Sequence, residues 1–437
     1  MREQRIDNNR DGNKKRIVVA GFGFGGFSFC RRLRHDLGRR GMEGVDLLVV
    51  NDSSRITFTP LLPYLAGSRI SPQAISTDIG DLGRKLGFRF IHGRIDQVDL
   101  AEKTIVVKGV KMSYDLIVIS TGSSDNYHGI SITGDNVFQL KTLEDASELA
   151  RRTLVSNVNP CINGRGSYSL AVIGGGQTGV ETTALMSGQV KGHLGPRTLS
   201  HERVLLMEAS GRILSREPAE ASRIALRELE RTGVEVRVIA GISGIDGERI
   251  VLSDGSSVES ETIVWAAGVR ANSLIQGIPG RILTGNGRIR VDERLSIAQV
   301  RDAYALGDVA SIEGPLGKPL PENASVAVQE GRFLAHQVAG IIMNGGTSRS
   351  GFRYRDFGHV IPLGHNCLYV GAQGALLTGL PARWLAWAIH FLELFTTRNR
   401  LEFLAETFPF IGSMRVKAGH RKRSGRVSGV PAQRFSQ

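Results

Sequence analysis

The chain has 437 residues, of which 41% are hydrophobic and 22% charged, which is ordinary for a folded protein of two or three domains. Its three cysteines, Cys30, Cys161 and Cys367, argue against a disulfide framework, and they form no C-x-x-C pair that could act as a redox disulfide. The net charge of +13 favours anionic partners, but no recognition motif accompanies it, so we expect no nucleic-acid binding.

The two ends of the chain carry much of the positive charge. Residues 1–15 are polar and lack the apolar stretch of a signal peptide, so we expect a flexible tail. Residues 416–437 are basic and poor in apolar side chains, and we expect a disordered tail there. The chain has no apolar run of roughly 18 residues or more, which predicts that no helix spans a bilayer.

Two widely separated segments share one pattern, which is a short β-branched run followed by a glycine cluster and a stretch with helical character. The first run, residues 16–20, enters Gly21-Phe-Gly-Phe-Gly-Gly26, and the second, residues 169–173, enters Gly174-Gly-Gly-Gln-Thr-Gly179. A second apolar run follows each helical stretch, at residues 45–50 and 204–207. A strand–helix–strand unit that occurs twice predicts two parallel sheets, each with its own dinucleotide site.

The spacing G-x-G-x-x-G indicates what each turn can hold. The first glycine allows a sharp turn from strand to helix, the second lets the backbone approach a pyrophosphate, and the third lets the helix pack closely on the strand. The anion then lies against free N–H groups at the positive end of the helix. The candidate contacts are Gly21, Gly23, Phe24, Gly25 and Gly26 in the first turn, and Gly174, Gly176, Gln177, Thr178 and Gly179 in the second.

A polar residue that ends the second strand of such a unit binds ribose hydroxyls. Glu208 has this position in the second unit, and its charge would repel a 2′-phosphate, so we expect NADH to be preferred over NADPH. In the first unit the same role falls to Asn51 or to its neighbour Asp52, and the sequence leaves the two open.

Other small-residue turns also end apolar runs, and they are Thr121-Gly122, Ala267-Gly268 and Gly307-Asp308. We expect the Asp308 carboxylate to accept a hydrogen bond from a ribityl hydroxyl of a flavin. The helix that begins near Ala324 would point its positive end at the same flavin. The loop 58–63, which contains Pro60 and Leu61, has no charge and would form an apolar wall beside the flavin ring.

These elements predict an α/β protein with two Rossmann-like domains and a C-terminal part of another kind. We expect an FAD-binding domain from residues 16–144 and 286–345, an NAD(H)-binding domain from 145–285, and a membrane-associating region from 346–415.

The membrane assignment depends on one helical segment. Trp384, Trp387, Phe391 and Leu394 recur at helical spacing, while the polar residues His390 and Glu393 interrupt the apolar run. We therefore expect a helix that lies on an anionic membrane surface, next to the arginines at 398 and 400. A buried core helix or a contact in a homodimer is the alternative.

The order of the elements resembles the two-dinucleotide flavoproteins, with a glutathione-reductase-like arrangement of FAD and NAD(P)H domains, and within them the type II NADH dehydrogenases. The resemblance covers the chain from Lys15 to about Phe410. Its markers are Phe58-Thr-Pro-Leu-Leu62, Gly174-Gly-Gly-Gln-Thr-Gly-Val-Glu181, Trp265-Ala-Ala-Gly-Val-Arg270, Ala324-Ser-Val-Ala-Val-Gln329 and Arg398-Asn399-Arg400.

This resemblance implies a peripheral enzyme on the cytoplasmic face of the cell membrane, with FAD held non-covalently. Such an enzyme takes hydride from NADH and passes the electrons to a quinone without pumping protons. The resemblance also implies that Glu181 is a proton relay, and that Gln329 is the second glutamine of an A-Q-x-x-x-Q quinone signature. Ser325 replaces the first glutamine and Gln177 also departs from the family pattern, so a different acceptor stays open.

Three other functions fit the same architecture. A sulfide:quinone oxidoreductase needs two cysteines beside the flavin, and the three cysteines here do not stand at such positions. A reductase of ferredoxin-type carriers would use soluble partners without the aromatic C-terminal helix. A flavin-binding redox sensor without turnover is the non-enzymatic alternative. None of these functions, nor the main one, requires a metal site.

Overall fold

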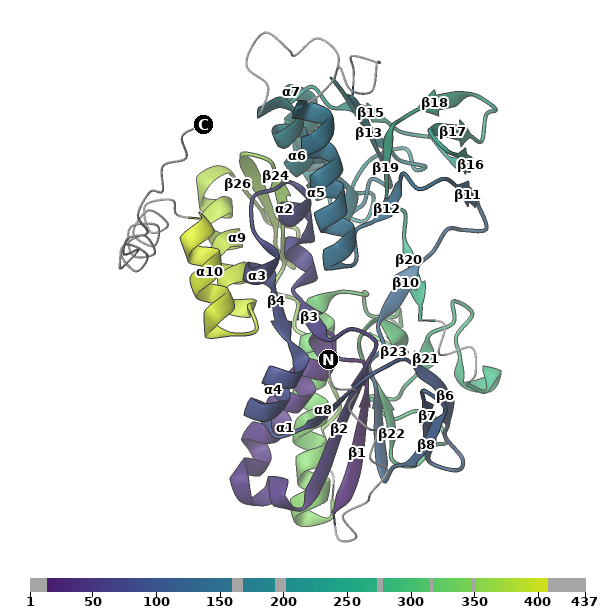
Figure 1. Cartoon of the computed structure of the whole chain (residues 1–437), viewed down its shortest axis with the longest axis vertical. Coiled ribbons are helices and arrows are strands. Elements are labelled where there is room, and N and C mark those ends of the chain that lie inside the picture. The colour runs from purple at the N-terminus through teal and green to yellow at the C-terminus, as the bar shows by residue number, and fades with distance from the viewer. Residues whose placement is uncertain are drawn as a thin grey trace, which may run out of the picture.

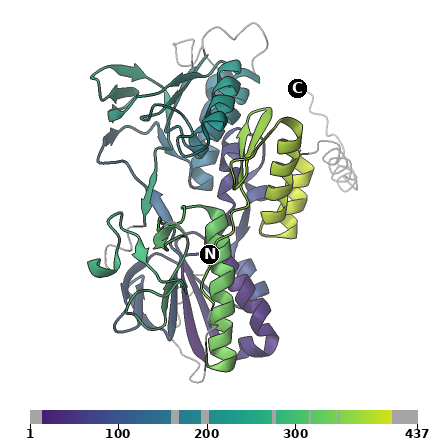
Figure 2. The ribbon, with the colours of Figure 1, turned by 180° about the vertical axis from the view of Figure 1, so that it is seen from behind.

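The computed structural model of the protein describes residues 14–158, 168–192, 202–272, 278–314, 317–346 and 350–407 (Figures 1 and 2). Within these ranges the chain forms two α/β halves, which lie one above the other in Figure 1. A small sheet and two helices from the C-terminal part lie beside them. The predicted α/β class with two Rossmann-like halves is confirmed.

The lower half is built on a parallel sheet with the strand order β22-β9-β1-β2-β5. Its strands are β1 (Lys15–Ala20), β2 (Val45–Asn51), β5 (Arg89–His92), β9 (Leu116–Ile119) and β22 (Ala303–Ala305). In β1 and β9 the aliphatic side chains are buried on both faces, as expected of a parallel sheet that is covered on both sides. The predicted flexible tail 1–15 lies outside the described residues up to Asn13, and Lys15 already pairs with Val45.

The upper half repeats this design with the strand order β12-β19-β13-β14-β15, again all parallel. Its strands are β12 (Val137–Gln139), β13 (Tyr168–Ile173), β14 (Glu202–Met207), β15 (Glu235–Arg237) and β19 (Thr262–Trp265). Strand β13 is therefore the counterpart of β1, and β14 is the counterpart of β2.

Helices cover both sheets. The long helices α1 (Phe24–Glu43) and α8 (Ala324–Asn344) lie side by side on the lower sheet, and a Cβ at Gly331 would overlap with the carbonyl oxygen of Gly25. The upper half carries α5 (Leu143–Val158), α6 (Gln177–Gly192) and α7 (Ala219–Arg231). Both helices expected after the glycine turns are therefore present.

Smaller strands complete each half. The lower half has an antiparallel meander of β6 (Ile95–Asp99), β7 (Thr104–Val107) and β8 (Val110–Ser113). It also has two strand pairs. One is β3 (Arg55–Thr57) with β4 (Ser76–Asp78), and the other is β21 (Ile289–Arg290) with β23 (Ala310–Ser311). The upper half has β11 (Ser131–Thr133), β16 (Ile242–Asp246), β17 (Arg249–Leu252) and β18 (Ser257–Glu259).

Short helices follow β3 and lead into β5. They are the single turn η1 (Thr59–Leu61), α2 (Leu62–Ala66), α3 (Pro72–Ile75) and α4 (Ile79–Leu86).

The chain changes from one sheet to the other at two antiparallel strands, β10 (Ser123–Asp125) and β20 (Val269–Ala271), which pair with each other. Strand β12 already pairs with β19 in the upper sheet, so the seam that we predicted after residue 144 falls too late. The seam predicted after residue 285 is also late, because β20 returns the chain to the lower half. Both errors have one cause, since the crossing strands are too short to give a periodic pattern.

The C-terminal part forms a three-stranded antiparallel sheet and two helices. These are β24 (His359–Leu363), β25 (Asn366–Val370), β26 (Leu376–Thr378), α9 (Gly379–Glu393) and α10 (Thr397–Thr407). Among the described residues, no helix is long and apolar enough to cross a membrane. The predicted disordered tail 416–437 lies outside the described residues.

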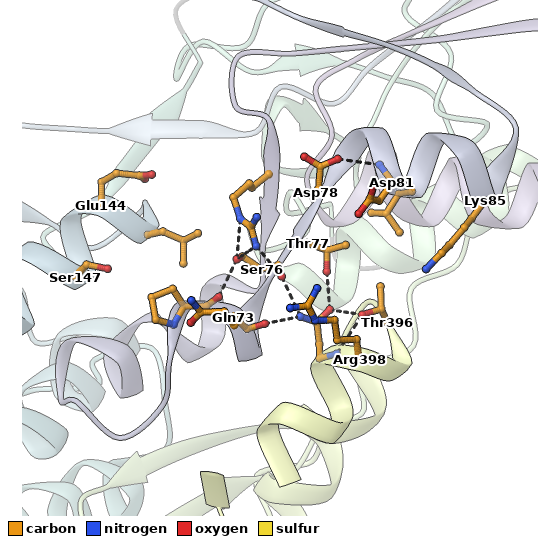
Figure 3. Close-up of a pocket in the computed structure, with 15 residues that line it drawn as sticks. Gln73, Ser76, Thr77, Asp78, Asp81, Lys85, Glu144, Ser147, Thr396 and Arg398 are labelled. Atoms are coloured by element: carbon orange, nitrogen blue, oxygen red, sulfur yellow. Dashed lines mark hydrogen bonds between the residues drawn. The ribbon is translucent and has the colours of Figure 1, made fainter. Parts of the chain in front are cut away.

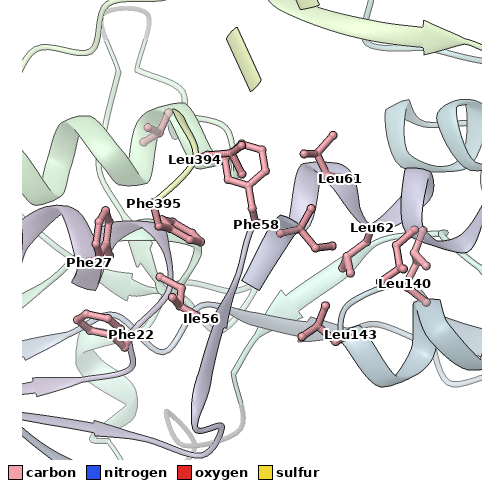
Figure 4. Packing of buried hydrophobic residues seen from close by; sticks show 14 of the residues in the cluster. Phe22, Phe27, Ile56, Phe58, Leu61, Leu62, Leu140, Leu143, Leu394 and Phe395 are labelled. Atoms are coloured by element: carbon pink, nitrogen blue, oxygen red, sulfur yellow. The ribbon is translucent and has the colours of Figure 1, made fainter. Parts of the chain in front are cut away.

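The three parts share one hydrophobic core (Figure 4). Leu61 and Leu62 of the lower half belong to the same buried cluster as Leu140 and Leu143 of the upper half. Phe395, in the link between α9 and α10, packs against rings of the lower half, with its ring centroid 5.0 Å from that of Phe27 and 5.8 Å from that of Phe58. The halves are therefore joined by apolar packing as well as by two crossing strands.

Candidate functional site

The two glycine turns have the same geometry, although they lie on different sheets. Gly21 and Gly174 follow β1 and β13 with φ of +94° and +109°, and a Cβ on either would lie 2.5 Å from a carbonyl oxygen of the neighbouring strand end. Gly23 and Gly176 are exposed, and a Cβ there would meet nothing within 4 Å. Each turn thus leaves its backbone uncovered by side chains at the point where a pyrophosphate would lie.

The helix ends at both turns are free to bind an anion. Gly23 caps α1 without a side-chain hydrogen bond, and the first turns of α1 and α6 contain no acidic residue. Phe24 is half-buried at the first turn of α1, whereas Gln177 and Thr178 are exposed at the start of α6. Unpaired N–H groups at a helix start favour phosphate oxygens, which suits both turns.

The strand-end residues that we expected to bind ribose lie against these turns. Asn51 ends β2, and its Oδ1 accepts a hydrogen bond of 2.9 Å from the backbone N–H of Phe22. Glu208 follows β14, and its Oε2 accepts a bond of 2.6 Å from the N–H of Gly175. Asp52 is exposed, and a hydrogen bond joins its backbone carbonyl oxygen to the His92 ring. The geometry therefore favours Asn51 over Asp52 as the equivalent of Glu208.

A third turn lies at the same edge of the lower sheet as the first, after the parallel strand β22. Asp308 lies in the turn Gly307–Val309, and its Oδ2 accepts a hydrogen bond of 2.8 Å from the Ser123 hydroxyl. The N–H of Gly307 donates to Glu330 at 2.6 Å, and burial raises the pKa of this carboxyl to about 8. Ala324 starts α8 nearby, after the cap residue Asn323. Glu330 thus fixes the turn that carries Asp308.

Two buried hydroxyl groups around this turn lack hydrogen-bond partners among the described residues. They belong to Thr121 and Ser124, whereas the ammonium group of the nearby Lys141 forms an ion pair with Asp125 at 3.5 Å. Buried polar groups of this kind normally find a partner. A flavin dinucleotide with its ribityl and pyrophosphate groups would supply one, so the residues present fit FAD.

The corresponding turn in the upper half is half-buried to exposed. Ala267 is half-buried, Gly268 is exposed with φ of +123°, and the carbonyl oxygen of Ala267 lies 2.8 Å from the ring nitrogen Nε2 of His128. Gly122, with φ of +68°, is half-buried in the lower half.

The loop expected to form an apolar wall beside the flavin is more deeply buried than we predicted. The side chains of Phe58, Leu61 and Leu62 are 0% exposed and belong to the shared core, and Pro60 is half-buried. The reason is that the loop folds into η1 and α2, which turn the leucines inward. The backbone and the side chains of Thr59 and Pro60 remain for contact with a ligand in front of the loop.

Glu181 lies in α6 beyond its first turn, so stabilisation of the helix start does not explain it. It is half-buried and makes no hydrogen bond or ion pair with the described residues. Desolvation raises the pKa of its carboxyl to about 8. Tyr64 and Cys367 lie close enough for its charge to raise their pKa values as well, after the larger effect of burial.

A histidine from the C-terminal part completes this group. His390 is 7% exposed on α9, and its ring lies 6.1 Å from the rings of both Tyr64 and Phe58. Burial lowers the pKa of His390 to about 4, so the ring is neutral at neutral pH. The group therefore combines a protonated carboxyl, a phenol and a neutral imidazole at the junction of all three parts of the fold.

Gln329 is the second residue that we expected to act on the acceptor. Its side chain forms hydrogen bonds with the backbone of Arg355 instead. Its amide nitrogen donates to the Arg355 carbonyl at 2.9 Å, and its amide oxygen accepts from the Arg355 N–H at 3.1 Å. Its amide nitrogen also lies 3.3 Å from the hydroxyl of Ser325, the residue that departs from the glutamine signature. Gln329 thus holds the segment before β24 in place.

The cysteines do not form a sulfur relay within the described residues. Cys30 is buried in α1 and Cys367 in β25, and both are free thiols whose pKa values burial raises. Cys161 lies outside the described residues. No group of three metal-ligating side chains that could hold an ion occurs in the part of the chain that the structure describes.

The marker Arg398-Asn399-Arg400 has a structural explanation. Asn399 is 1% exposed, its Oδ1 accepts from the Thr77 hydroxyl at 2.6 Å, and its amide donates to Gln73 and Ser76 carbonyls. It thereby fastens α10 to the lower half, at the edge of a cavity of about 560 Å³ (Figure 3). The cavity is lined by Arg55, Lys85, Arg398 and other side chains, none of which belongs to a glycine turn.

Sequence reasoning did not single out Tyr64, His390 or Glu330 as parts of a site. Glu330 did carry a signal, because it stands on the face of α8 that is otherwise marked by the apolar residues Val326 and Leu334. A carboxylate at a core position of a helix requires a partner. His390 also carried a signal, because it interrupts the apolar run of its helix, but Tyr64 carried none, and only long-range folding brings the two together.

Two parallel sheets with matching glycine turns, polar strand ends and unpartnered polar atoms define a flavoprotein with two dinucleotide sites. The chain belongs to the pyridine nucleotide-disulphide oxidoreductase family, whose sequence pattern matches residues 15–331. It is 28% identical over 439 aligned residues to a type II NADH:quinone oxidoreductase of Mycobacterium tuberculosis, which covers 92% of this chain and 89% of that protein. The expected resemblance to type II NADH dehydrogenases is confirmed.

Solved structures show the same fold. The NDH2 of Plasmodium falciparum in complex with NADH superposes with a TM-score of 0.80 at 19% identity, covering 90% of this chain and 97% of that one. A sulfide:quinone oxidoreductase of Aquifex aeolicus reaches 0.73 at 18% identity, covering 88% and 92%. At these identities the likeness concerns the fold alone, so the choice between activities depends on the site residues.

Proposed function

We propose that the protein is an FAD-dependent oxidoreductase that passes electrons from NADH to a quinone without pumping protons. The observation that carries this proposal is the pair of open glycine turns on two joined sheets, one with Asn51 and one with Glu208 at the strand end. The names of relatives that align along nearly the whole chain agree with it. The absence of a cysteine pair among the described residues disfavours sulfide as the electron donor.

The lower half holds FAD in this proposal. The turn from Gly21 to Gly26 and the N-terminus of α1 bind the pyrophosphate. Asn51 binds the adenosine ribose, and Asp308 binds the ribityl chain. Thr121, Gly122, Gly307 and Ala324 surround the flavin end, and Pro60 and Leu61 stand in front of it with their backbone. FAD, when bound, supplies an acceptor for hydride at its N5 atom and a donor of two electrons.

The upper half holds NADH. Gly174, Gly176 and Gly179, with Gln177 and Thr178, bind the pyrophosphate at the start of α6. Glu208 binds ribose hydroxyls and disfavours a 2′-phosphate by charge repulsion. Ala267 and Gly268 lie at the end of β19 where the nicotinamide end passes toward the lower half.

The group around Glu181 supplies a proton to the acceptor in this proposal. Reduction of a quinone to a quinol consumes two electrons and two protons, while NADH delivers two electrons with one proton as hydride. The second proton has to reach the acceptor through the protein. Glu181 holds a proton at neutral pH because its pKa is raised to about 8, Tyr64 lies near it, and the neutral His390 packs against Tyr64. Gln329 positions the adjoining segment.

The C-terminal part binds a membrane surface in this proposal. Leu380, Trp384 and Leu392 of α9 are 67%, 58% and 65% exposed. Arg383 and Arg398 provide positive charge for anionic headgroups. The protein would then be peripheral on the cytoplasmic face of the cell membrane. A homodimer is compatible with the same exposed face.

An anaerobic two-step experiment tests the proposal. The purified protein is first reduced with NADH and then mixed with ubiquinone, menaquinone or soluble ferredoxin and rubredoxin. We expect yellow protein, rapid bleaching by NADH, and fast reoxidation by at least one quinone. Reoxidation by the soluble carriers alone, or bleaching by sulfide instead of NADH, would contradict it.

A further inference from the structure

Three polar side chains connect the C-terminal sheet with the glycine turn of the upper half. Gln177 is the first residue of α6, and its amide nitrogen donates a hydrogen bond of 3.3 Å to Oε1 of Glu217. The same oxygen lies 3.3 Å from the ring nitrogen Nε2 of His359 on β24. Gln177 is the position at which this turn departs from the family pattern, so that pattern does not explain the contact.

The loop that carries Glu217 is fixed against the turn. The N–H of Leu214 donates to the carbonyl oxygen of Gly175 at 2.7 Å. The guanidinium group of Arg212 donates to the backbone carbonyls of Leu214, Ser215 and Glu217 at 2.7 to 2.8 Å. The Glu217 carboxylate therefore has a defined place beside the start of α6.

This carboxylate is charged, and it lies beside a site that we expect to bind an anion. The pKa of Glu217 is lowered, first by the His359 ring and, against the effect of burial, also by Gln177 and Arg212. The first turn of α6 itself contains no acidic residue. A carboxylate next to the positive end of a helix repels a pyrophosphate unless a partner compensates for its charge. His359 is in the position of such a partner.

The Gln177 side chain has one donor left for a ligand. An amide nitrogen carries two N–H donors, and one of them is directed to Glu217. Exchange of the amide nitrogen and oxygen would bring two oxygens together, so the carboxylate fixes the orientation of the amide. Gln177 is exposed, and its second N–H is available to a phosphate oxygen at the turn.

We propose that Glu217 and His359 are positioning residues for NADH. Glu217 orients the Gln177 amide toward the pyrophosphate, and His359 compensates for the charge of Glu217. This inference rests on the proposed function, because it takes the turn that begins at Gly174 as the NADH site. The C-terminal part, which carries His359, thereby helps to set the affinity of a nucleotide site in the upper half.

The substitution His359→Ala tests the proposal, because it leaves the Glu217 carboxylate without its partner. We expect the Kd for ADP-ribose and the KM for NADH to rise about fivefold with kcat unchanged, since the loss corresponds to one hydrogen bond that is the same in ground and transition states. The inhibition constant of adenosine, which has no phosphate, should not change, and this binding also shows that the upper half is folded. Gln177→Ala should give a rise of similar size.

A second change separates charge compensation from general damage. In the double variant His359→Ala with Glu217→Gln, the uncharged amide oxygen at position 217 still accepts from Gln177. The Kd for ADP-ribose should therefore return close to the value of the parent. His365→Ala removes an exposed histidine from the turn between β24 and β25 and should change nothing.

Any of three results would overturn the inference. These are an unchanged Kd for ADP-ribose in His359→Ala, an equal loss of adenosine binding in that variant, and a double variant that binds no better than His359→Ala. Failure of the proposed function looks different. A parent protein that binds ADP-ribose but does not oxidise NADH contradicts that function, whereas the comparison of ADP-ribose binding still decides the role of His359.

Discussion

Glu208 and Asn51 occupy equivalent positions, and each ties its strand end to the second residue of a glycine turn. The Glu208 carboxylate also accepts a hydrogen bond of 2.7 Å from the N–H of Ser210, so both of its oxygens are used on the backbone. A hydrogen bond to a charged acceptor is stronger than one to a neutral acceptor. The carboxylate therefore fixes the conformation of the loop and places a negative charge where we expect the ribose of a nucleotide to bind.

The first prediction concerns Glu208→Gln. We expect kcat/KM for NADH to fall about tenfold and the preference for NADH over NADPH to shrink, because one acceptor and the negative charge are lost. Steady-state rates with the two nucleotides measure this. Asp52→Asn, an exposed change at the other sheet, serves as the control. Equal rates of the parent with NADH and NADPH would remove this role from Glu208.

The second prediction concerns the proton on Glu181. Its pKa of about 8 predicts that acceptor reduction slows as pH rises through 8, because the carboxyl then loses its proton. Glu181→Gln should slow acceptor reduction at neutral pH, abolish this pH dependence and leave reduction by NADH nearly unchanged. Stopped-flow traces of the two half-reactions separate these steps. The exposed change Glu230→Gln should alter neither, and an unchanged pH profile in Glu181→Gln would contradict the relay.

The same raised pKa has a consequence for stability. Between about pH 4.5 and pH 8 the folded protein keeps a proton on Glu181 that the unfolded chain releases. Stability therefore falls as pH rises through this window, and Glu181→Gln removes that part of the slope. Chemical denaturation at several pH values measures it without any acceptor.

Most residues of the dinucleotide turns could be predicted from the sequence, because G-x-G-x-x-G and the strand-end polar residue are local patterns. The group of Tyr64, Cys367 and His390 around Glu181 could not, since its members come from α2, β25 and α9.

At the scale of elements, α9 was predicted at nearly its observed place but with the wrong exposed face. Trp387 and Phe391 stack on each other, with ring centroids 5.4 Å apart, and Trp387 also lies 6.1 Å from Phe403 of α10. Leu394 is 1% exposed. Of the four residues in the predicted stripe only Trp384 is exposed, because α10 packs on Trp387 and Phe391 and because Leu394 belongs to the shared core.

The third prediction follows from the face that is exposed. The double change Leu380→Asn with Trp384→Asn should lower partition onto anionic phosphatidylglycerol vesicles by about 100-fold, given the free energy of burying two large apolar side chains. Vesicle sedimentation measures it, with Met343→Asn as the control. Added salt should weaken binding of the parent, because Arg383 and Arg398 act by charge. Binding that survives the double change would place the anchor elsewhere.

At the scale of the whole molecule, the repeated strand–helix–strand units predicted two sheets correctly, but they did not indicate how closely the halves are joined. The predicted seams treated the halves as independent segments. Strands β10 and β20, together with the leucines that α2 and α5 bury in one cluster, connect the halves instead. Such packing between sequence-distant helices leaves no local pattern, because each helix shows only its own apolar face.

The fourth prediction follows from this shared core. A single apolar cluster contains Leu61, Leu62, Leu140, Leu143 and Phe395, so separating the halves would expose it, and we expect the holoprotein to unfold in one cooperative transition. ADP-ribose, which the proposed function assigns to the upper half, should then shift the same calorimetric peak to higher temperature that FAD shifts. Each ligand should stabilise the folded state by about 2.7 kcal/mol at a concentration of 100 Kd. Leu143→Ala should lower the cooperativity, whereas Leu401→Ala, an exposed change, should not. Two peaks that respond separately to the two ligands would show that the halves fold independently.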